Sequence, residues 1–278
     1  MIIRKILSIA LAAVLFIPVL RAQDVADHQG GAGTREGYVE AGRFNARWAT
    51  QGVAVDRKHC YVIDNTHITK FTKQGDSLIT WSCDDKSRFR HLNYGIVVGR
   101  KLYCAHSNFP LYPMTSSVEI FDTRTMRHIG SHSFGIDYGS LTWIIPSGKC
   151  WYAFFAHYTK PASQTKGDPD DHKFSQLVKF DSQWRKIAAW TLPESLLGEL
   201  GTASLSGGIL IGDTFYCTGH DCYEVHKLKI PESGSTLEWV GNVKVPFYGQ
   251  AASLDRDGSL WGIIRKEHAV VHGVPANE

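Results

Sequence analysis

Polar side chains suited to catalysis or ligand binding stand at the ends of several short apolar segments of this chain. Five segments resemble one another: residues 61–64, 103–106, 154–157, 216–220 and 260–265. They end in Asp64, His106, His157, His220 and Arg265. Because imidazole is both a metal ligand and a general acid or base near neutral pH, the recurrence predicts a repeat protein that brings histidines to one place.

The three histidines admit two chemical interpretations. If His106, His157 and His220 converge, they predict a site for one divalent metal ion, since neutral imidazole is a common metal ligand. Without a metal, one of them is expected to act as a general base beside an acid such as Asp221 or Glu224. We take the three histidines and Asp221 as the candidate catalytic residues.

Other polar residues stand just before or just after apolar segments and are candidate ligand-binding residues. They are Gln51, Asp64, Tyr94, Glu224, Gln250 and Arg265. For His67, His91 and His132 we expect structural or solvent-facing roles.

Short β-strands must position these residues. Runs rich in Val, Ile, Phe, Tyr and Trp alternate with turns of Gly, Asp, Ser and Asn, and only residues 193–200 have a helical pattern. The strands recur in sets of four, and a repeat of roughly 40 to 50 residues is typical of the blades of a β-propeller. The sequence therefore predicts an all-β fold.

The last set of strands lacks one strand at the C-terminal end. Residues 38–56 and 237–255 align without a gap, matching at Gly42 with Gly241, Gln51 with Gln250 and Asp56 with Asp255. This match predicts that residues 38–43 form the outer strand of the last blade and close a five-bladed propeller. The alternative is six blades, with one hidden between residues 157 and 220.

The topology of a propeller predicts where the candidate residues meet. Successive strands of a blade run antiparallel, so the loop entering the first strand and the loop leaving the second open on the same face. The candidate residues occupy these loops, and we expect them to surround one mouth of the central channel. A concave place with a few convergent polar groups is typical of a ligand site.

The first residues indicate export. Arg4 and Lys5 precede the apolar residues 6–20, and Ala22 supplies a small residue for cleavage, so residues 1–22 are predicted to be a signal peptide. We expect residues 23–36 to be a flexible segment and residues 37–278 to be one propeller domain. The mature protein is then secreted or periplasmic, with no membrane insertion after cleavage.

Composition restricts the partners. Removing residues 1–22 takes away three basic residues and no acid, which leaves 27 basic against 27 acidic residues. A nucleic-acid partner is not expected, because no basic stripe is present. The chain has neither a Gly-x-Ser-x-Gly motif nor a phosphate-binding glycine loop, which disfavours serine hydrolase and nucleotide chemistry. We expect a monomer.

The six cysteines leave two possibilities open. Export permits disulfides, and Cys217 and Cys222 flank a turn that a disulfide would close. Alternatively, the cysteines are small buried apolar residues. No Cys-x-x-Cys pair predicts a zinc or redox site.

The phrases at residues 52–56 (Gly-Val-Ala-Val-Asp) and 61–65 (Tyr-Val-Ile-Asp-Asn) resemble those of secreted or periplasmic propellers of the NHL, lactonase-like and YncE-like group. The resemblance covers residues 37–275; it implies the architecture and carries no catalytic assignment. Some propeller polysaccharide lyases look similar in combining histidines with a glutamine at a metal site.

These observations together predict a hydrolase or lyase that acts on an extracellular carbohydrate or a lactone-like small molecule. The alternatives are a noncatalytic propeller that binds a glycan or another small ligand, and a propeller that serves as a protein-interaction platform.

Overall fold

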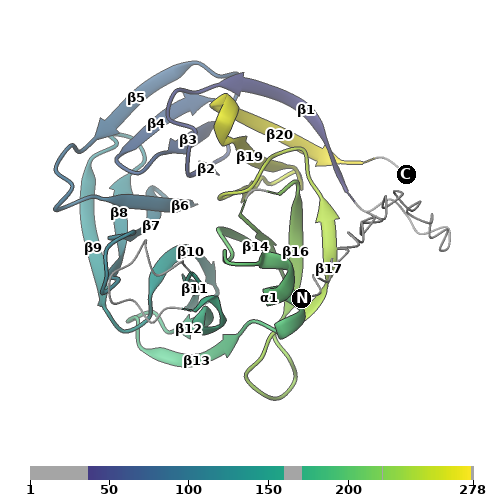
Figure 1. Ribbon diagram of the computed structural model, residues 1–278. Coiled ribbons are helices and arrows are strands. Elements are labelled where there is room, and N and C mark those ends of the chain that lie inside the picture. Colours follow the sequence, from purple (N-terminus) through teal and green to yellow (C-terminus); the bar gives the residue numbers. More distant parts are fainter. Residues whose placement is uncertain (1–36, 160–170, 221, 277–278) are drawn as a thin grey trace, which may run out of the picture. The chain divides into compact units, whose positions relative to one another are not determined.

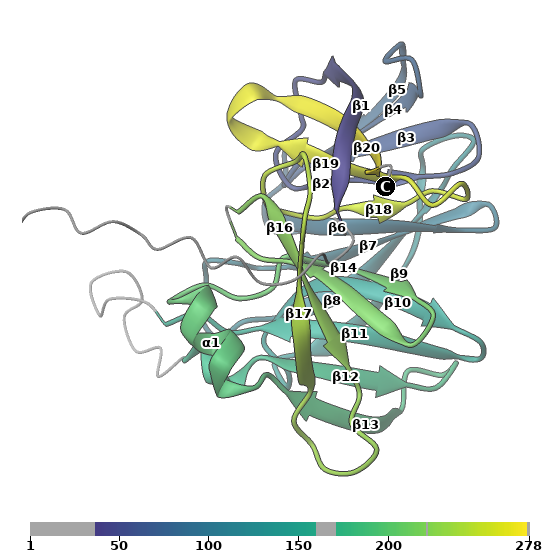
Figure 2. The same ribbon diagram turned by 90° about the vertical axis from the view of Figure 1, so that its right-hand side faces the viewer.

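The computed structural model describes residues 37–159, 171–220 and 222–276, which form five four-stranded antiparallel sheets. The sheets are arranged as blades around a common axis (Figure 1), and a view turned by 90° shows the ring from its side (Figure 2). The predicted all-β class and the five-bladed propeller are therefore confirmed. The expected signal peptide and the segment 23–36 lie outside the described residues.

Each blade runs from an inner strand to an outer strand. Blade 1 contains β2 (Gly52–Val55), β3 (His59–Ile63), β4 (His67–Thr72) and β5 (Ser77–Ser82). Blade 2 contains β6 (His91–Val98), β7 (Lys101–Ser107), β8 (Ser116–Asp122) and β9 (His128–Gly135). Blade 3 contains β10 (Ser140–Ser147), β11 (Cys150–Ala156), β12 (Gln176–Phe180) and β13 (Lys186–Thr191).

The remaining blades follow the same order. Blade 4 contains β14 (Gly207–Ile211), β15 (Thr214–Thr218), β16 (Glu224–Lys229) and β17 (Glu238–Lys244). Blade 5 contains β18 (Ser253–Leu254), β19 (Leu260–Ile264), β20 (Ala269–Pro275) and, as its outer strand, β1 (Tyr38–Asn45). The strands described between residues 157 and 220 all belong to blades 3 and 4, so no sixth blade lies among them.

The sequence pattern of each strand follows its place in the blade. The inner strand β10 is buried along most of its length, because blades pack against both of its faces. The outer strands β9 and β17 alternate between partly buried and exposed residues, since only one face packs on the neighbouring blade. Between blades 3 and 4, the Trp143 ring packs on Gly208, where an added Cβ would lie 2.7 Å from the indole. Glycine is therefore required for this close approach.

The ring is closed by strands from the two ends of the described chain. β1 pairs antiparallel with β20 from Tyr38 opposite Pro275 to Asn45 opposite Ala269, with a bulge between Glu40 and Gly42. This pairing confirms the predicted closure. Because β1 covers β20, the outer edge of that strand is not left open.

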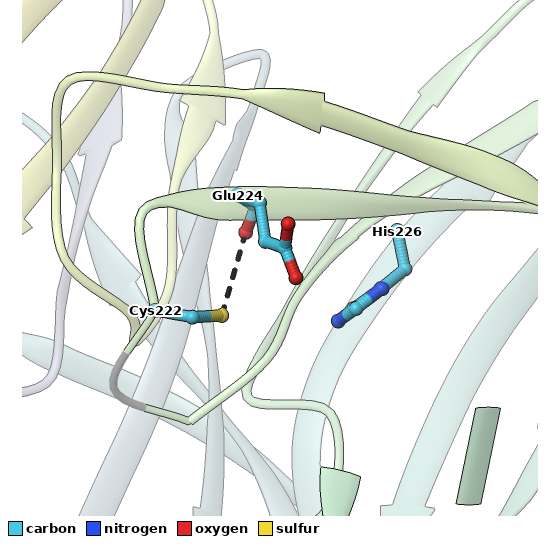
Figure 3. A group of neighbouring side chains, drawn as sticks. All are labelled: Cys222, Glu224 and His226. Atoms are coloured by element: carbon cyan, nitrogen blue, oxygen red, sulfur yellow. Dashed lines mark hydrogen bonds between the residues drawn. The ribbon is translucent and has the colours of Figure 1, made fainter. Parts of the chain in front are cut away.

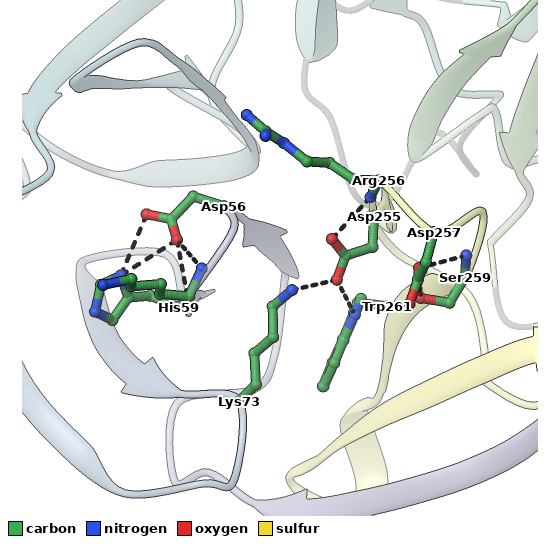
Figure 4. A network of polar contacts seen from close by, with 9 residues as sticks. Asp56, His59, Lys73, Asp255, Arg256, Asp257, Ser259 and Trp261 are labelled. Atoms are coloured by element: carbon green, nitrogen blue, oxygen red, sulfur yellow. Dashed lines mark hydrogen bonds and ion pairs between the residues drawn. The ribbon is translucent and has the colours of Figure 1, made fainter.

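A polar network adds a second connection between blades 1 and 5 (Figure 4). Lys73, which precedes β5 of blade 1, forms an ion pair with Asp255 of blade 5. The indole Nε1 of Trp261 donates to the same carboxylate at 3.1 Å. Nearer the axis, Ser253 Oγ donates to the Val53 carbonyl oxygen at 2.9 Å.

Helical structure is limited to short segments among the described residues. They are α1 (Glu194–Leu200), η1 (His172–Phe174) and η2 (Arg265–Glu267). The predicted helical segment is thus present as α1, which follows Pro193 and ends at Gly201, whose φ of 63° favours glycine. No helix in this part of the chain is long and apolar enough to cross a membrane.

Candidate functional site

A polar cavity of about 720 Å³ lies where the inner strands begin. Side chains at or just before the inner strands contribute one wall: Gln51, His91, Asn93, Thr142, Ser206 and Gln250. Residues that follow second strands contribute another: Asp64, His220 and Arg265. The structure therefore brings together five of the predicted site residues, two from the first set and three from the second.

Hydrogen bonds between blades fix this rim. Asn93 Nδ2 donates to the Leu141 carbonyl oxygen at 2.8 Å, and Thr142 Oγ1 donates to the Leu205 carbonyl oxygen at 2.9 Å. These bonds connect blade 2 to blade 3 and blade 3 to blade 4. Because polar groups on neighbouring blades hold one another, the cavity has a largely preformed lining.

His91 begins β6 and faces the cavity, although we expected a structural or solvent-facing role for it. Burial lowers the pKa of this imidazole to about 3, and the charges of His106 and Arg265 contribute in the same direction. Its ring centroid lies 5.0 Å from that of Phe109. His91 is therefore neutral at ordinary pH and suited to donating or accepting a hydrogen bond without carrying charge.

Arg265 directly follows β19 and lines the cavity from blade 5. Its Nε donates to the Thr50 carbonyl oxygen at 2.7 Å, which anchors the guanidinium across the junction with blade 1. Thr50 also connects to Asp64, because its hydroxyl donates to one carboxylate oxygen at 2.5 Å. A cation and a carboxylate thus lie on the same side of the cavity.

Gln250 combines a strained backbone with a buried, unpaired amide nitrogen. Its φ of 58° lies in the left-handed region, and the residue is only 5% exposed. Its amide Nε2 is buried and has no hydrogen-bond partner. The corresponding residue of blade 1, Gln51, instead donates to Asn65 Oδ1 at 3.0 Å. Strain and unpaired polar groups cluster at functional sites, so Gln250 is a candidate ligand contact.

The formal charges of the cavity lining are mostly positive. Lys86, Arg90 and Arg265 line it, against Asp64 as the carboxylate among the described lining residues. Phe109 and Tyr158 add aromatic faces. This combination suits a small polar ligand that carries or develops negative charge.

His106 is placed differently from the expectation, since it is not among the described residues that line the cavity. Its Nε2 accepts a hydrogen bond from the Arg90 backbone N–H at 3.1 Å, and its Nδ1 lies 2.9 Å from Ser117 Oγ. Ser117 donates in turn to the buried carboxylate of Glu119 at 2.6 Å. His106 therefore positions the segment that carries Arg90.

The reason is strand register. β7 extends to Ser107, one residue beyond His106, and Ser107 packs between blades, where it accepts from Ser140 Oγ at 2.9 Å. Adjacent residues of a strand point to opposite faces, so His106 turns away from the side occupied by Ser107.

His157 also lies outside the described lining of the cavity. Its Nε2 lies 3.0 Å from the Tyr138 carbonyl oxygen, and its ring packs over Gly139, where an added Cβ would approach the imidazole to 2.4 Å. Its backbone N–H donates to Ser175 Oγ at 3.0 Å. The ring contacts connect the end of β11 to the segment before β10, and the backbone bond connects it to the residue before β12.

Tyr94 requires a correction. We expected it at the polar mouth, but it is 2% exposed and lines a second cavity of about 280 Å³. That cavity is mostly apolar, with Val55, Val97 and Leu254 at the other ends of the inner strands. Because the inner strands begin at one cavity and end at the other, the two cavities lie at opposite ends of the channel.

The predicted metal ligands do not form a group. Within the described ranges, one group of three potential ligands has its atoms within 4.8 Å of one another, namely Cys222, Glu224 and His226. Glu224, a predicted ligand-binding residue, is thus placed in this group and not in the described cavity lining. Asp221 lies outside the described residues. No disulfide joins Cys217 to Cys222.

Comparison with known proteins supports the fold. No protein-family model matches the chain, and no curated protein matches it. Among solved structures, the glutaminyl cyclase of Myxococcus xanthus is similar over 87% of this chain and 99% of that chain, with 7% identity and a TM-score of 0.56.

Two further structures are similar at TM-scores of 0.45. A protein of unknown function from Bacteroides caccae is 9% identical and covers 76% of this chain and 68% of that chain. The WD40 repeats of RRP9 are 11% identical and cover 81% of this chain and 79% of that chain. The similarity to the glutaminyl cyclase supports the β-propeller fold and shows no specific family.

Proposed function

We propose that the polar cavity at the channel mouth is the active site of a hydrolase or lyase whose substrate is a polar molecule with a carbonyl or carboxylate group. A lactone and a uronate-containing carbohydrate are the two substrate classes that fit. The observation that carries this proposal is the neutral His91 in the same cavity as Arg265. The proposal includes a location outside the cytoplasm, supported by the signal-like residues 1–22.

Both reactions place negative charge on a carbonyl oxygen. Lactone hydrolysis does so when water adds to the carbonyl carbon, and elimination from a uronate does so when the proton next to the carboxylate is removed. Preformed hydrogen-bond donors and cations stabilise such an oxyanion. A neutral imidazole acts as a donor of this kind, and a guanidinium supplies the charge.

Because the pKa of His91 is low, we propose that another group transfers the proton. An imidazole with a pKa of about 3 is a weak base at neutral pH, because general bases work best when their pKa is close to the working pH. His220 lines the same cavity and is exposed, so we assign proton transfer to it. The Gln250 amide is proposed to contact the substrate.

A substrate panel with matched variants tests the proposal. Wild-type protein is assayed with aliphatic lactones, gluconolactone and polygalacturonate, and then compared with His91→Phe, Arg265→Gln and the control His132→Phe. His132 stacks on Trp184 and is not among the described cavity residues. We expect a loss of about 10²- to 10³-fold for Arg265→Gln, typical of removing oxyanion stabilisation, and no loss for the control. An inactive wild type contradicts the proposal.

Cyclisation of an N-terminal glutamine is a second candidate, because a glutaminyl cyclase shares the fold over nearly its whole chain. In this reaction an amine attacks a side-chain amide carbonyl, and the amide C–N bond then breaks with release of ammonia. The addition step again needs oxyanion stabilisation, and the Asp64 carboxylate in the cavity would hold the amine. Glutaminyl peptides therefore belong in the panel. Turnover of these peptides alone would select this candidate, whereas binding without any turnover would favour the noncatalytic alternative.

A further inference from the structure

Three side chains of different ligand chemistry face one another where the chain enters β16. Cys222 lies in the turn between β15 and β16, while Glu224 and His226 lie two residues apart at the start of β16. Residues two apart in a strand project from the same face, so the alternation of β16 brings the carboxylate and the imidazole together. Figure 3 shows the thiol, the carboxylate and the imidazole turned toward a common space.

Gly219 leaves that space open. A Cβ built on this residue would lie 3.0 Å from Cys222 Sγ and 3.3 Å from His226 Nε2. The sulfur and this ring nitrogen therefore approach the same volume from two sides. The potential ligand atoms of the three residues all lie within 4.8 Å of one another. Small side-chain movements would bring them to the separations of about 3–4 Å that a tetrahedral zinc site needs.

The surroundings of the group resemble those of a metal site. His226 is 2% exposed, and its other ring nitrogen, Nδ1, is buried without a hydrogen-bond partner. Glu224 Oε2 accepts a hydrogen bond from Asn242 Nδ2 at 2.7 Å, which orients the carboxylate from β17. Metal ligands are commonly oriented by such outer contacts. The outer contact of Glu224 is therefore already formed, whereas His226 Nδ1 has no such contact.

We propose that Cys222, Glu224 and His226 bind a zinc-class divalent cation. Thiolate, imidazole and carboxylate are all zinc ligands, whereas calcium and magnesium require oxygen ligands. Three protein ligands leave a fourth position for water. The cation would connect the turn to β16 and so hold the segment that carries His220 at the cavity.

The test of this site does not depend on the catalytic proposal, because metal binding is measured without substrate. Cobalt(II) is titrated into the full mature chain after treatment with a chelator, and thiolate-to-cobalt charge-transfer absorption reports a bond to sulfur. Zinc affinity is then measured by competition. We expect one cobalt ion per chain with the thiolate band, and displacement of the cobalt by one equivalent of zinc.

Matched variants identify the ligands. Cys222→Ser is expected to abolish the band, while Cys83→Ser, which changes another partly buried cysteine, leaves it intact. Glu224→Gln is expected to weaken zinc binding, whereas Glu238→Gln, on the neighbouring strand β17, does not. Asn242→Ala is expected to weaken it by about 10- to 100-fold, the usual effect of removing an outer contact.

Two results would overturn the site. One is a wild-type protein without a thiolate–cobalt band, and the other is a band that Cys222→Ser leaves unchanged. Circular dichroism establishes that each variant is folded. If Cys222→Ser does not fold, the Glu224→Gln and Glu238→Gln pair decides the question, because equal zinc affinity in these two variants also rejects the site.

Discussion

The two ends of the central channel are built by the same five inner strands but have opposite chemistry. At the end where the strands begin, Gln51, His91 and Gln250 line a cavity of about 720 Å³. At the other end, Val55 and Leu254 contribute to an apolar cavity of about 280 Å³. The scaffold therefore does not dictate a polar interior, and the polar groups at the mouth are a property of one end alone. This difference suggests that function is confined to the mouth, while the other end contributes stability.

The largest expected effect tests the apolar end. Tyr94→Ala removes a fully buried ring and should lower the free energy of unfolding by about 3–5 kcal/mol, since large-to-small core changes leave a cavity. Denaturant unfolding measures the change. At the mouth, His91→Gln should change stability by less than about 1 kcal/mol at neutral pH. Equal losses of stability in the two variants would contradict the proposed difference between the two ends of the channel.

A smaller effect is expected at the mouth, on the activation free energy of the proposed reaction. Arg265→Gln should reduce kcat/KM by about 10²-fold or more for the active member of the substrate panel, because the oxyanion loses its nearby cation. Steady-state kinetics provide the measurement, and Arg256→Gln, which changes an exposed arginine at the other end of blade 5, is the control. An equal loss in the control would assign the effect to overall charge.

The titration of His91 sharpens the comparison through pH. Its pKa is about 3 in the folded protein against 6.5 for an unperturbed histidine, so the unfolded chain binds this proton more readily. The free energy of unfolding should therefore fall as pH falls from about 6.5 toward 3, by at most about 1.4 kcal/mol per pH unit from this group.

Urea unfolding at a series of pH values measures this contribution. His91→Gln should show a shallower decrease than the wild type over this range, while His268→Asn, at an exposed position, should follow the wild type. An unchanged slope in His91→Gln would mean that the imidazole is as accessible to protons as in the unfolded chain.

The smallest expected effect separates the two matched glutamines. Gln250→Leu removes a buried amide that has no partner and should leave stability unchanged or raise it by about 1 kcal/mol. Gln51→Leu breaks the bond to Asn65 and should lower stability by about 1 kcal/mol. If Gln250→Leu also loses activity, this amide serves the ligand and not the fold. Thermal unfolding and turnover of the two variants decide the point.

The fold could be predicted because blade repeats leave a periodic signal in the sequence. The match between residues 38–56 and 237–255 identified the closing strand, and the structure confirms its pairing with β20. Strand identity and order depend on local patterns of apolar residues and turns, which a single sequence contains.

The site was less accessible to prediction because it depends on register and burial. His106 lies within β7 and not after it, on the face opposite to Ser107, and only two residues of β6 separate His91 at the mouth from the buried Tyr94. The low pKa of His91 arises from burial and from neighbouring charges, which no local motif records. The alternation of Cys222, Glu224 and His226 was visible in the sequence, but it is not a familiar zinc spacing.

The central claim is that the mouth cavity performs catalysis through a neutral His91. Its most direct test compares turnover by wild-type protein, His91→Phe and His132→Phe on the active member of the panel of lactones, polygalacturonate and glutaminyl peptides. Phenylalanine removes the hydrogen-bond donor at either position. The account predicts a large loss of kcat in His91→Phe alone, with all three proteins equally folded. Wild-type activity in His91→Phe, or no turnover of any panel member by the wild type, would contradict it.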